Sequence, residues 1–150
     1  MIKYFIYMKK IETFYKSLKE VTEHQTRCSK AWLVASEIIF VSCKENAEIE
    51  LEDAKEDMKL SEKLVDGISR FATIVDITNL KSVSKAARDF YSKVQNDNPR
   101  NISFALIVNS FYTRIIANFF FGLKNSRTEM RIFNEKDVAI EWVYQKLEIN

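Results

Sequence analysis

The chain has 150 residues, of which 47% are hydrophobic and 13% aromatic, with two glycines, one proline and a formal net charge of +2. This length suits one domain with a substantial core, and the composition excludes disordered, collagen-like and low-complexity proteins. The net charge is too small for a nucleic-acid-binding protein, which needs a large basic excess to displace counterions from phosphates.

The composition also predicts a cytoplasmic protein without a membrane span. No run reaches the roughly 18–20 apolar residues that a span needs, and Lys3 interrupts the apolar start, which no small-residue cleavage site follows. Cys28 and Cys43 are too few for a disulfide framework, although they could pair with each other. Met8 is a second candidate start of the natural chain, which would leave residues 1–7 outside it.

The first 29 residues are expected to form a basic amphipathic extension to an α/β domain at residues 30–150. Residues 1–30 contain seven lysines and arginines against three glutamates. Within residues 11–21, apolar side chains recur at helical spacing. They are Ile11, Phe14, Tyr15 and Leu18. Such a helix packs on the domain or on a second copy of it, or it binds a membrane surface or a partner protein.

The remaining residues alternate between strand-like and helix-like patterns. Strands are predicted from apolar runs rich in β-branched residues, and helices from apolar residues three and four apart. The predicted strands lie within 30–44 (two strands around a turn), 71–78, 102–109 and 129–133, and the predicted helices span 50–68, 82–95, 111–124 and 134–149. The order β-β-α-β-α-β-α-β-α predicts an α/β fold with a mixed, mostly parallel sheet of about five strands, crossover helices and one antiparallel hairpin.

Polar and glycine residues mark several predicted helix ends. Gly67 lies where a left-handed residue ends helix 50–68. Asn134 is the predicted cap of the last helix, with Asp137 three residues later in a pattern close to a capping box.

No catalytic constellation is recognisable, so we expect neither an enzyme nor a bound cofactor or metal. His24 is the only histidine, and with Cys28 it supplies two potential metal ligands without an obvious third. The two glycines stand alone, so no glycine-rich loop is available to hold phosphates. Acidic residues such as Glu56 and Asp57 are expected on the solvated side of helix 50–68 rather than in acid–base catalysis.

The residues after the predicted strand 71–78 are more informative. In open α/β sheets, sites form beyond the carboxyl ends of strands, where helix N-termini present N–H groups. Asp76 and Thr78 lie at such an end, and Ser84 and Lys85 lie at the start of the next helix. Asp76 and Ser84 are expected to hydrogen-bond their own turns, with Ser84 as an N-cap. A phosphate on Ser84 would alternatively meet a helix N-terminus, which favours negative charge.

Three stretches of the sequence resemble a family of small bacterial proteins with a STAS-like fold. They are AWLVASEIIFVSCKENAEIELEDAKE, VDITNLKSVSKAARDF, and RIIANFFFGL followed by TEMRIFNEKDVAIEWV. This fold is shared by anti-sigma-factor antagonists and the cytoplasmic tails of sulfate transporters, and it is often compared with lipid-carrying CRAL-TRIO domains. The resemblance covers residues 30–148 and implies a STAS-like α/β domain.

In the antagonists, a phosphorylated serine at the start of the helix after a VDI-type strand controls binding to a kinase. The corresponding position here falls near Lys85, one residue after Ser84. The antagonist pattern Asp-Ser-Ser/Thr-Gly is replaced by Ser84, Lys85, Ala86 and Ala87. The resemblance therefore implies a partner-docking surface at residues 78–91, in which Ser84 is either a phosphorylation site or only a helix cap.

The predicted helix 111–124 carries more apolar residues than one core face accommodates. Two lines of residues are predicted to face the sheet, namely Ile115, Phe119 and Gly122, and Ile116, Phe120 and Leu123. A separate line contains Arg114, Asn118, Phe121 and Asn125. Either the N-terminal helix covers Phe121, or this line is an interaction patch with the composition of a hot spot, used for self-association.

Together these features predict a non-catalytic regulatory or protein-interaction module that forms a homodimer. The predicted partner-binding residues are Asp76, Thr78, Ser84, Lys85, Arg114, Asn118 and Phe121. The alternative is a small apolar-ligand or lipid-binding protein of the CRAL-TRIO type, in which the many phenylalanine and isoleucine residues line a cavity.

Overall fold

A mixed sheet forms the centre of the computed structural model, which describes residues 1–95, 98–121 and 128–149, apart from the side chains of residues 95 and 118–121. The strands are β1 (His24–Gln25), β2 (Ser29–Val34), β3 (Ile38–Cys43), β4 (Ala47–Ile49), β5 (Phe71–Asp76), β6 (Leu80–Val83), β7 (Asn101–Ile107) and β8 (Glu129–Phe133). The helices are α1 (Ile2–Glu20), α2 (Leu51–Leu64), α3 (Lys85–Gln95), α4 (Phe111–Phe121) and α5 (Lys136–Leu147).

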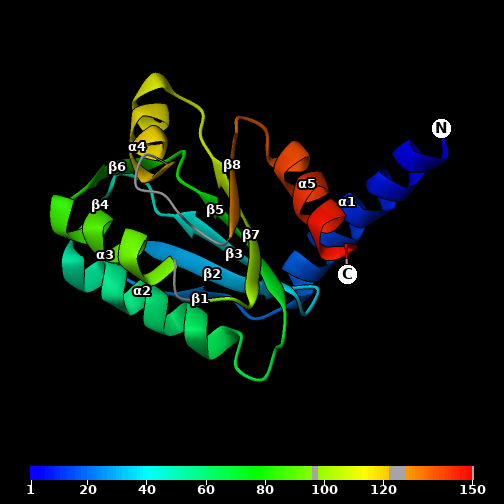
Figure 1. Ribbon diagram of the computed structural model, residues 1–150, viewed down its shortest axis with the longest axis horizontal. Coiled ribbons are helices and arrows are strands. Elements are labelled where there is room, and N and C mark those ends of the chain that lie inside the picture. Colours follow the sequence, from blue (N-terminus) through cyan, green and yellow to red (C-terminus); the bar gives the residue numbers. More distant parts are fainter. Residues whose placement is uncertain (96–97, 122–127, 150) are drawn as a thin grey trace.

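Six strands form the main sheet in the order β1-β2-β3-β5-β7-β8. The pairs β1–β2 and β2–β3 are antiparallel, whereas β3–β5, β5–β7 and β7–β8 are parallel. Figure 1 shows α1 and α5 on one side of this sheet and α2 and α3 on the other. The predicted α/β order and the mixed, mostly parallel sheet with its initial hairpin are therefore confirmed.

The central strands are apolar on both faces, so each face requires a helical layer. On one face, Ile74 and Ile107 pack with α5 and the second half of α1. On the other face, Phe104 and Leu106 belong to a second cluster that includes residues of α2, α3 and α4. Successive residues of β7 alternate between these two clusters, as the pleat of a strand requires.

Helix α1 joins the first core from its middle onward. Phe14 is fully buried, and its ring meets the Phe40 ring edge-on with the centroids 5.6 Å apart. The Tyr15 hydroxyl donates a 2.6 Å hydrogen bond to Asp137 at the start of α5. The Ser17 hydroxyl oxygen accepts a 2.8 Å hydrogen bond from the Ala35 N–H in the β2–β3 turn. The helix is thus fixed to both the sheet and α5.

Several local predictions need correction. The strands β1, β4 and β6 have two to four residues each, which is too short for a periodic pattern, and they were not predicted. Strand β4 pairs with β6 as a separate two-stranded sheet, so residues 82–83 belong to a strand instead of the predicted helix. The N-cap of α5 is Glu135, so the prediction that Asn134 caps this helix is wrong.

Gly67 has the predicted left-handed backbone, with a φ of +80° two residues after the C-cap of α2. Within the described parts of the chain, no helix combines the length and hydrophobicity that crossing a bilayer requires.

The burial of Phe14 predicts a large stability loss on truncation. We expect Phe14→Ala to lower the free energy of unfolding by about 3–5 kcal/mol, because it leaves a cavity between α1 and the sheet. Val138→Ala is the matched control, since Val138 is an exposed residue of α5 and its loss should cost little. Urea denaturation measures both. Equal stability of the two variants would contradict the docking of α1 in the core.

Candidate functional site

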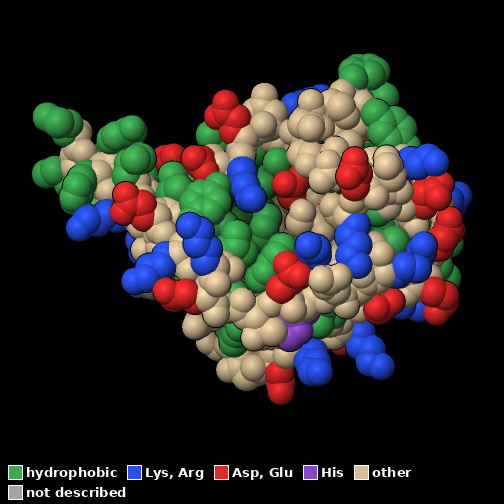
Figure 2. Space-filling view, turned by 180° about the vertical axis from the view of Figure 1, so that it is seen from behind, with side chains coloured by type: hydrophobic (Ala, Val, Ile, Leu, Met, Phe, Trp, Pro, Cys, Tyr) green, Lys and Arg blue, Asp and Glu red, His purple; other side chains and the backbone are tan. Residues whose placement is uncertain are grey.

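Three exposed apolar side chains lie close together on α4. Phe111 is 81% exposed and Ile115 52%, with Tyr112 and the exposed Arg114 beside them. Phe111 and Ile115 are four residues apart and share one side of the helix, with Tyr112 and Arg114 at the two edges of this side. Hydrophobic side chains stand out over α4 at the upper right of Figure 2. We call Phe111, Tyr112, Arg114 and Ile115 the α4 face.

The buried side of α4 is formed by Thr113, Ile116 and Ala117. Ile116 faces the core as predicted, but the prediction that Ile115 faces the sheet is wrong. The Thr113 hydroxyl explains the orientation, because its oxygen accepts hydrogen bonds from the N–H groups of Asn109 and Ser110, at 3.3 and 3.2 Å. Thr113 is thereby held inward, and Ile115, two positions later, points away from the sheet.

The other residues predicted on this helix are only partly placed. Arg114 is exposed, as expected for an interaction patch. The side chains of Asn118 and Phe121 lie outside the described residues, as do those of Phe119 and Phe120. Of the predicted interaction patch, the structure therefore describes only the Arg114 side chain, in the first turns of α4.

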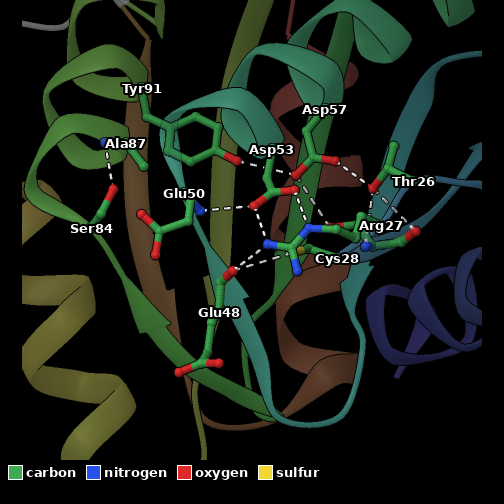
Figure 3. Close-up of polar contacts among 11 residues, drawn as sticks. Thr26, Arg27, Cys28, Glu48, Glu50, Asp53, Asp57, Ser84, Ala87 and Tyr91 are labelled. Carbon is green, nitrogen blue, oxygen red and sulfur yellow. Dashed lines mark hydrogen bonds and ion pairs between the residues drawn. The ribbon is translucent and has the colours of Figure 1, made fainter.

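The predicted docking surface at residues 78–91 consists of locally bonded groups. Asp76 accepts a 2.9 Å hydrogen bond from the Thr78 N–H, and Ser84 caps α3 by accepting one of 3.1 Å from the Ala87 N–H. Figure 3 shows the Ser84 contact. The exposed Lys85 forms an ion pair with Asp89 at 2.8 Å. The local turn bonds predicted for Asp76 and Ser84 are therefore present.

The α4 face and the 78–91 surface adjoin each other. Ile116 and Ala117 of α4 belong to the same apolar cluster as Leu80, Val83 and Ala87. Because both segments pack around this cluster, their outer sides flank one region of the molecular surface. Ser84 and Lys85 therefore lie on segments next to α4, the helix that carries Arg114.

A cluster of hydrogen-bonded side chains around Asp57 lies between α2 and the sheet, and the sequence analysis did not predict it. The Asp57 carboxylate accepts hydrogen bonds from the hydroxyls of Thr26 (2.6 Å), Tyr91 (3.2 Å) and Ser29 (3.3 Å). Figure 3 shows Thr26, Asp57 and Tyr91 converging from the turn before β2, from α2 and from α3. Burial raises the pKa of the Asp57 carboxyl, although the hydroxyl donors oppose this effect. The prediction that Asp57 lies on a solvated helix face is wrong.

An ion pair beside this group ties the loop before β2 to the start of α2. The Arg27 guanidinium bonds both carboxylate oxygens of Asp53, including a 2.7 Å contact from Nε, and donates to the Glu48 carbonyl at 2.9 Å. Asp53 also accepts a 2.9 Å hydrogen bond from the Glu50 N–H. The hydrogen bond from Arg27 holds the pKa of the Asp53 carboxyl below its usual value. Arg27 of the basic N-terminal region thereby pairs with Asp53 of the acidic helix α2.

A cavity of about 100 Å³ lies between the sheet and the helices α2 and α3. Its wall is mostly apolar, with Asp57, Tyr91 and Cys43 among its polar residues. Burial raises the pKa of the Cys43 thiol to about 12, so this thiol stays protonated and is a poor nucleophile at neutral pH. Small-molecule sites usually measure roughly 300–1,000 Å³, so the cavity is too small for a lipid.

His24 and Cys28 do not meet a third ligand in the described structure. His24 lies in β1 opposite Ala31, and Cys28 is buried as a free thiol, like Cys43. Among the described residues, no group of three or more His, Cys, Asp and Glu side chains is arranged to hold a metal ion.

Comparison with known proteins identifies the family. A family model described as "Domain of unknown function (DUF7793)" matches residues 31–146. The chain belongs to this family. No curated protein matches the chain.

A solved structure supports the fold. The crystal structure of an uncharacterized protein from the DUF3478 family, with a SpoIIAA-like fold, from Shewanella loihica PV-4, is similar with a TM-score of 0.53. The two chains are 18% identical, and the match covers 82% of this chain and 91% of that chain. At this identity the likeness shows the fold alone. It confirms the predicted STAS-like fold.

The capping bond of Ser84 predicts how substitutions at this position affect stability. We expect Ser84→Ala to lower the free energy of unfolding by about 1 kcal/mol, because the Ala87 N–H loses its acceptor. Ser84→Asp should retain most of the stability, since aspartate is an equally good N-cap. Thermal or urea denaturation of both variants tests this. A Ser84→Ala variant as stable as the native protein would show that the cap contributes nothing.

The raised pKa of the half-buried Asp57 predicts a pH-dependent difference in stability. Its folded-state pKa is raised, so its stabilising contribution is fully present below the unfolded pKa and is lost as pH rises through the folded pKa. We therefore expect the unfolding free energy of the native protein, minus that of Asp57→Asn, to fall as pH rises above about 4, the ordinary pKa of an aspartate. Urea denaturation at several pH values measures this difference. The exposed neighbour Glu56→Gln is the control, and a flat difference for Asp57→Asn would contradict the burial effect.

Proposed function

We propose that this chain is a non-catalytic regulatory module that binds protein and self-associates through the α4 face. The observation that supports this proposal is the exposure of Phe111, Tyr112 and Ile115 beside Arg114 on one side of α4. Aromatic residues and arginine are enriched in protein interfaces and dominate their binding energy. A helix side with this composition is better suited to a protein partner than to water.

A second copy of the chain is the partner that this face fits best. In a two-fold interface each subunit contributes the same surface, so the surface must complement itself. The α4 face carries both halves of a cation–π pair, because Arg114 lies three residues from Phe111 and thus beside its ring on the helix surface. Two antiparallel copies of α4 would place each guanidinium against the aromatic rings of the other copy.

The adjoining 78–91 surface provides a place for a regulatory partner. Lys85 and Asp89 are exposed there, and the Ser84 hydroxyl lies at the N-terminus of α3. A phosphate on Ser84 would be stabilised by this helix terminus but would replace the hydroxyl that caps it. In this proposal, Asp76 and Thr78 shape the turn beside the surface, and modification of Ser84 alters partner binding next to the α4 face.

The alternative function, binding of a lipid or another large apolar ligand, receives less support. The cavity beneath α2 and α3 has a volume of about 100 Å³, and the Asp57 carboxylate in its wall is already bonded to three hydroxyls. A cytoplasmic location fits the two buried free thiols, which a reducing compartment preserves.

The proposal predicts that a charge on the α4 face prevents self-association. We expect the native chain to sediment as a dimer and Ile115→Glu to sediment as a monomer with unchanged secondary structure, because the charge would be buried at the interface. Sedimentation velocity over a concentration series measures this. Val138→Glu, at another exposed apolar position in α5, is the matched control and should remain dimeric.

Two outcomes would contradict the proposal. A native chain that stays monomeric at every concentration would exclude self-association. A dimer that persists in Ile115→Glu but is lost in Ile6→Glu would place the interface on α1 instead of α4.

A further inference from the structure

The first turns of α1 carry a second set of exposed apolar side chains. Phe5 is 60% exposed and Ile6 44%, and Met1, Ile2, Tyr4 and Met8 are also exposed. Contact with the domain begins at Lys10, which forms a 3.6 Å ion pair with Glu148, and continues with Ile11 and Phe14. Figure 1 shows this end of α1 projecting beyond the domain, and Figure 2 shows the hydrophobic side chains gathered on it at the upper left. We call residues 1–9 the α1 tip.

The α1 tip is apolar on both sides of the helix. Tyr4 and Met8 continue, at steps of four and three residues, the line on which Ile11 and Tyr15 pack against the domain. Ile2, Phe5 and Ile6 lie on the opposite side, because 3.6 residues complete one turn. A helix segment that is hydrophobic on all sides is normally surrounded by an apolar environment.

The charged side chains of the α1 tip itself have one sign. Residues 1–9 contain two lysines, Lys3 and Lys9, and no aspartate or glutamate. The Lys9 ammonium lies 4.8 Å from the centre of the Phe5 ring, so a cation is held beside the apolar tip. Lysine side chains keep their charge in water while their methylene groups cover apolar surface. This combination complements an anionic headgroup layer above a hydrocarbon interior.

We propose that the α1 tip docks this domain on an anionic lipid bilayer surface. The basic residues contact the headgroups, and the apolar side chains enter the boundary between headgroups and acyl chains. The eight helical residues 2–9 span about 12 Å at 1.5 Å per residue, which is sufficient for the 5–10 Å depth of interfacial helices. The tip is far shorter than the roughly 30 Å hydrocarbon core, so it anchors the domain without crossing the bilayer.

A second copy of the chain fits the α1 tip less well. A helix–helix seam buries one stripe of side chains, so a partner helix on the Tyr4 and Met8 line would leave Ile2, Phe5 and Ile6 in water. A bilayer interface surrounds the tip and covers both sides. The α4 helix lies toward the opposite end of the molecule in Figure 1, so dimers formed through the α4 face would keep both tips available.

Co-sedimentation of the full chain with lipid vesicles tests this proposal. The vesicles contain either phosphatidylcholine alone or phosphatidylcholine mixed with phosphatidylglycerol. We expect binding to the mixed, anionic vesicles that weakens as salt concentration rises. Ile6→Glu should lower the partition coefficient by about tenfold or more, because an apolar side chain is lost from the buried tip and a repulsive charge is added.

Two matched variants make the vesicle result specific. Val138→Glu introduces the same charge at a position with the same 44% exposure as Ile6 and should bind like the native chain. Ile115→Glu should also bind the vesicles, so failure of the α4 interface and failure of the membrane site are distinguishable.

Three results would overturn the proposal. The native chain could stay in the supernatant with both kinds of vesicle, which would exclude membrane binding. It could also bind both kinds equally, which would exclude a preference for anionic lipids. Alternatively, Ile6→Glu could bind as well as the native chain.

Discussion

The apolar side chains on both faces of β3, β5 and β7 are the constraint on which the rest of the structure depends. Neither face can meet water, so α1 and α5 cover one and α2, α3 and α4 cover the other. The side chains available to bind other molecules therefore lie on the outer sides of the helices. The exposed apolar residues concentrate where this covering ends, on the outer side of α4 and on the first turns of α1.

The junction between β2 and α2 shows how charged groups are accommodated beside the core. Arg27 pairs with Asp53, and three hydroxyls satisfy the Asp57 carboxylate, so two acidic groups near the core have specific partners. Because removing one member would leave a buried polar group without its partner, this cluster specifies how α2 sits on the sheet. Its role is structural, and the binding surfaces proposed above lie elsewhere, on the helix exteriors.

Sequence reasoning predicted the features that depend on long periodic patterns. The strand runs at 71–78 and 102–109 are long and apolar, so they identified the central sheet, and Ser84 was recognisable as a cap from its position. The short pair β4 and β6 gave no periodic signal. Asp57 looked solvated because its partners Thr26 and Tyr91 are 31 and 34 residues away along the chain. The exposure of Ile115 depends on the hydrogen bonds of Thr113, which a helical pattern does not contain.

The central claim is that the chain acts by binding through the α4 face, and site-specific photo-crosslinking tests it most directly. Phe111 is replaced by p-benzoylphenylalanine in the purified full chain, with the same replacement at Val138 of α5 as the control. The account predicts a covalent dimer after irradiation of the Phe111 variant and none from the Val138 variant. Absence of a dimer at Phe111, or equal yields at the two positions, would contradict it.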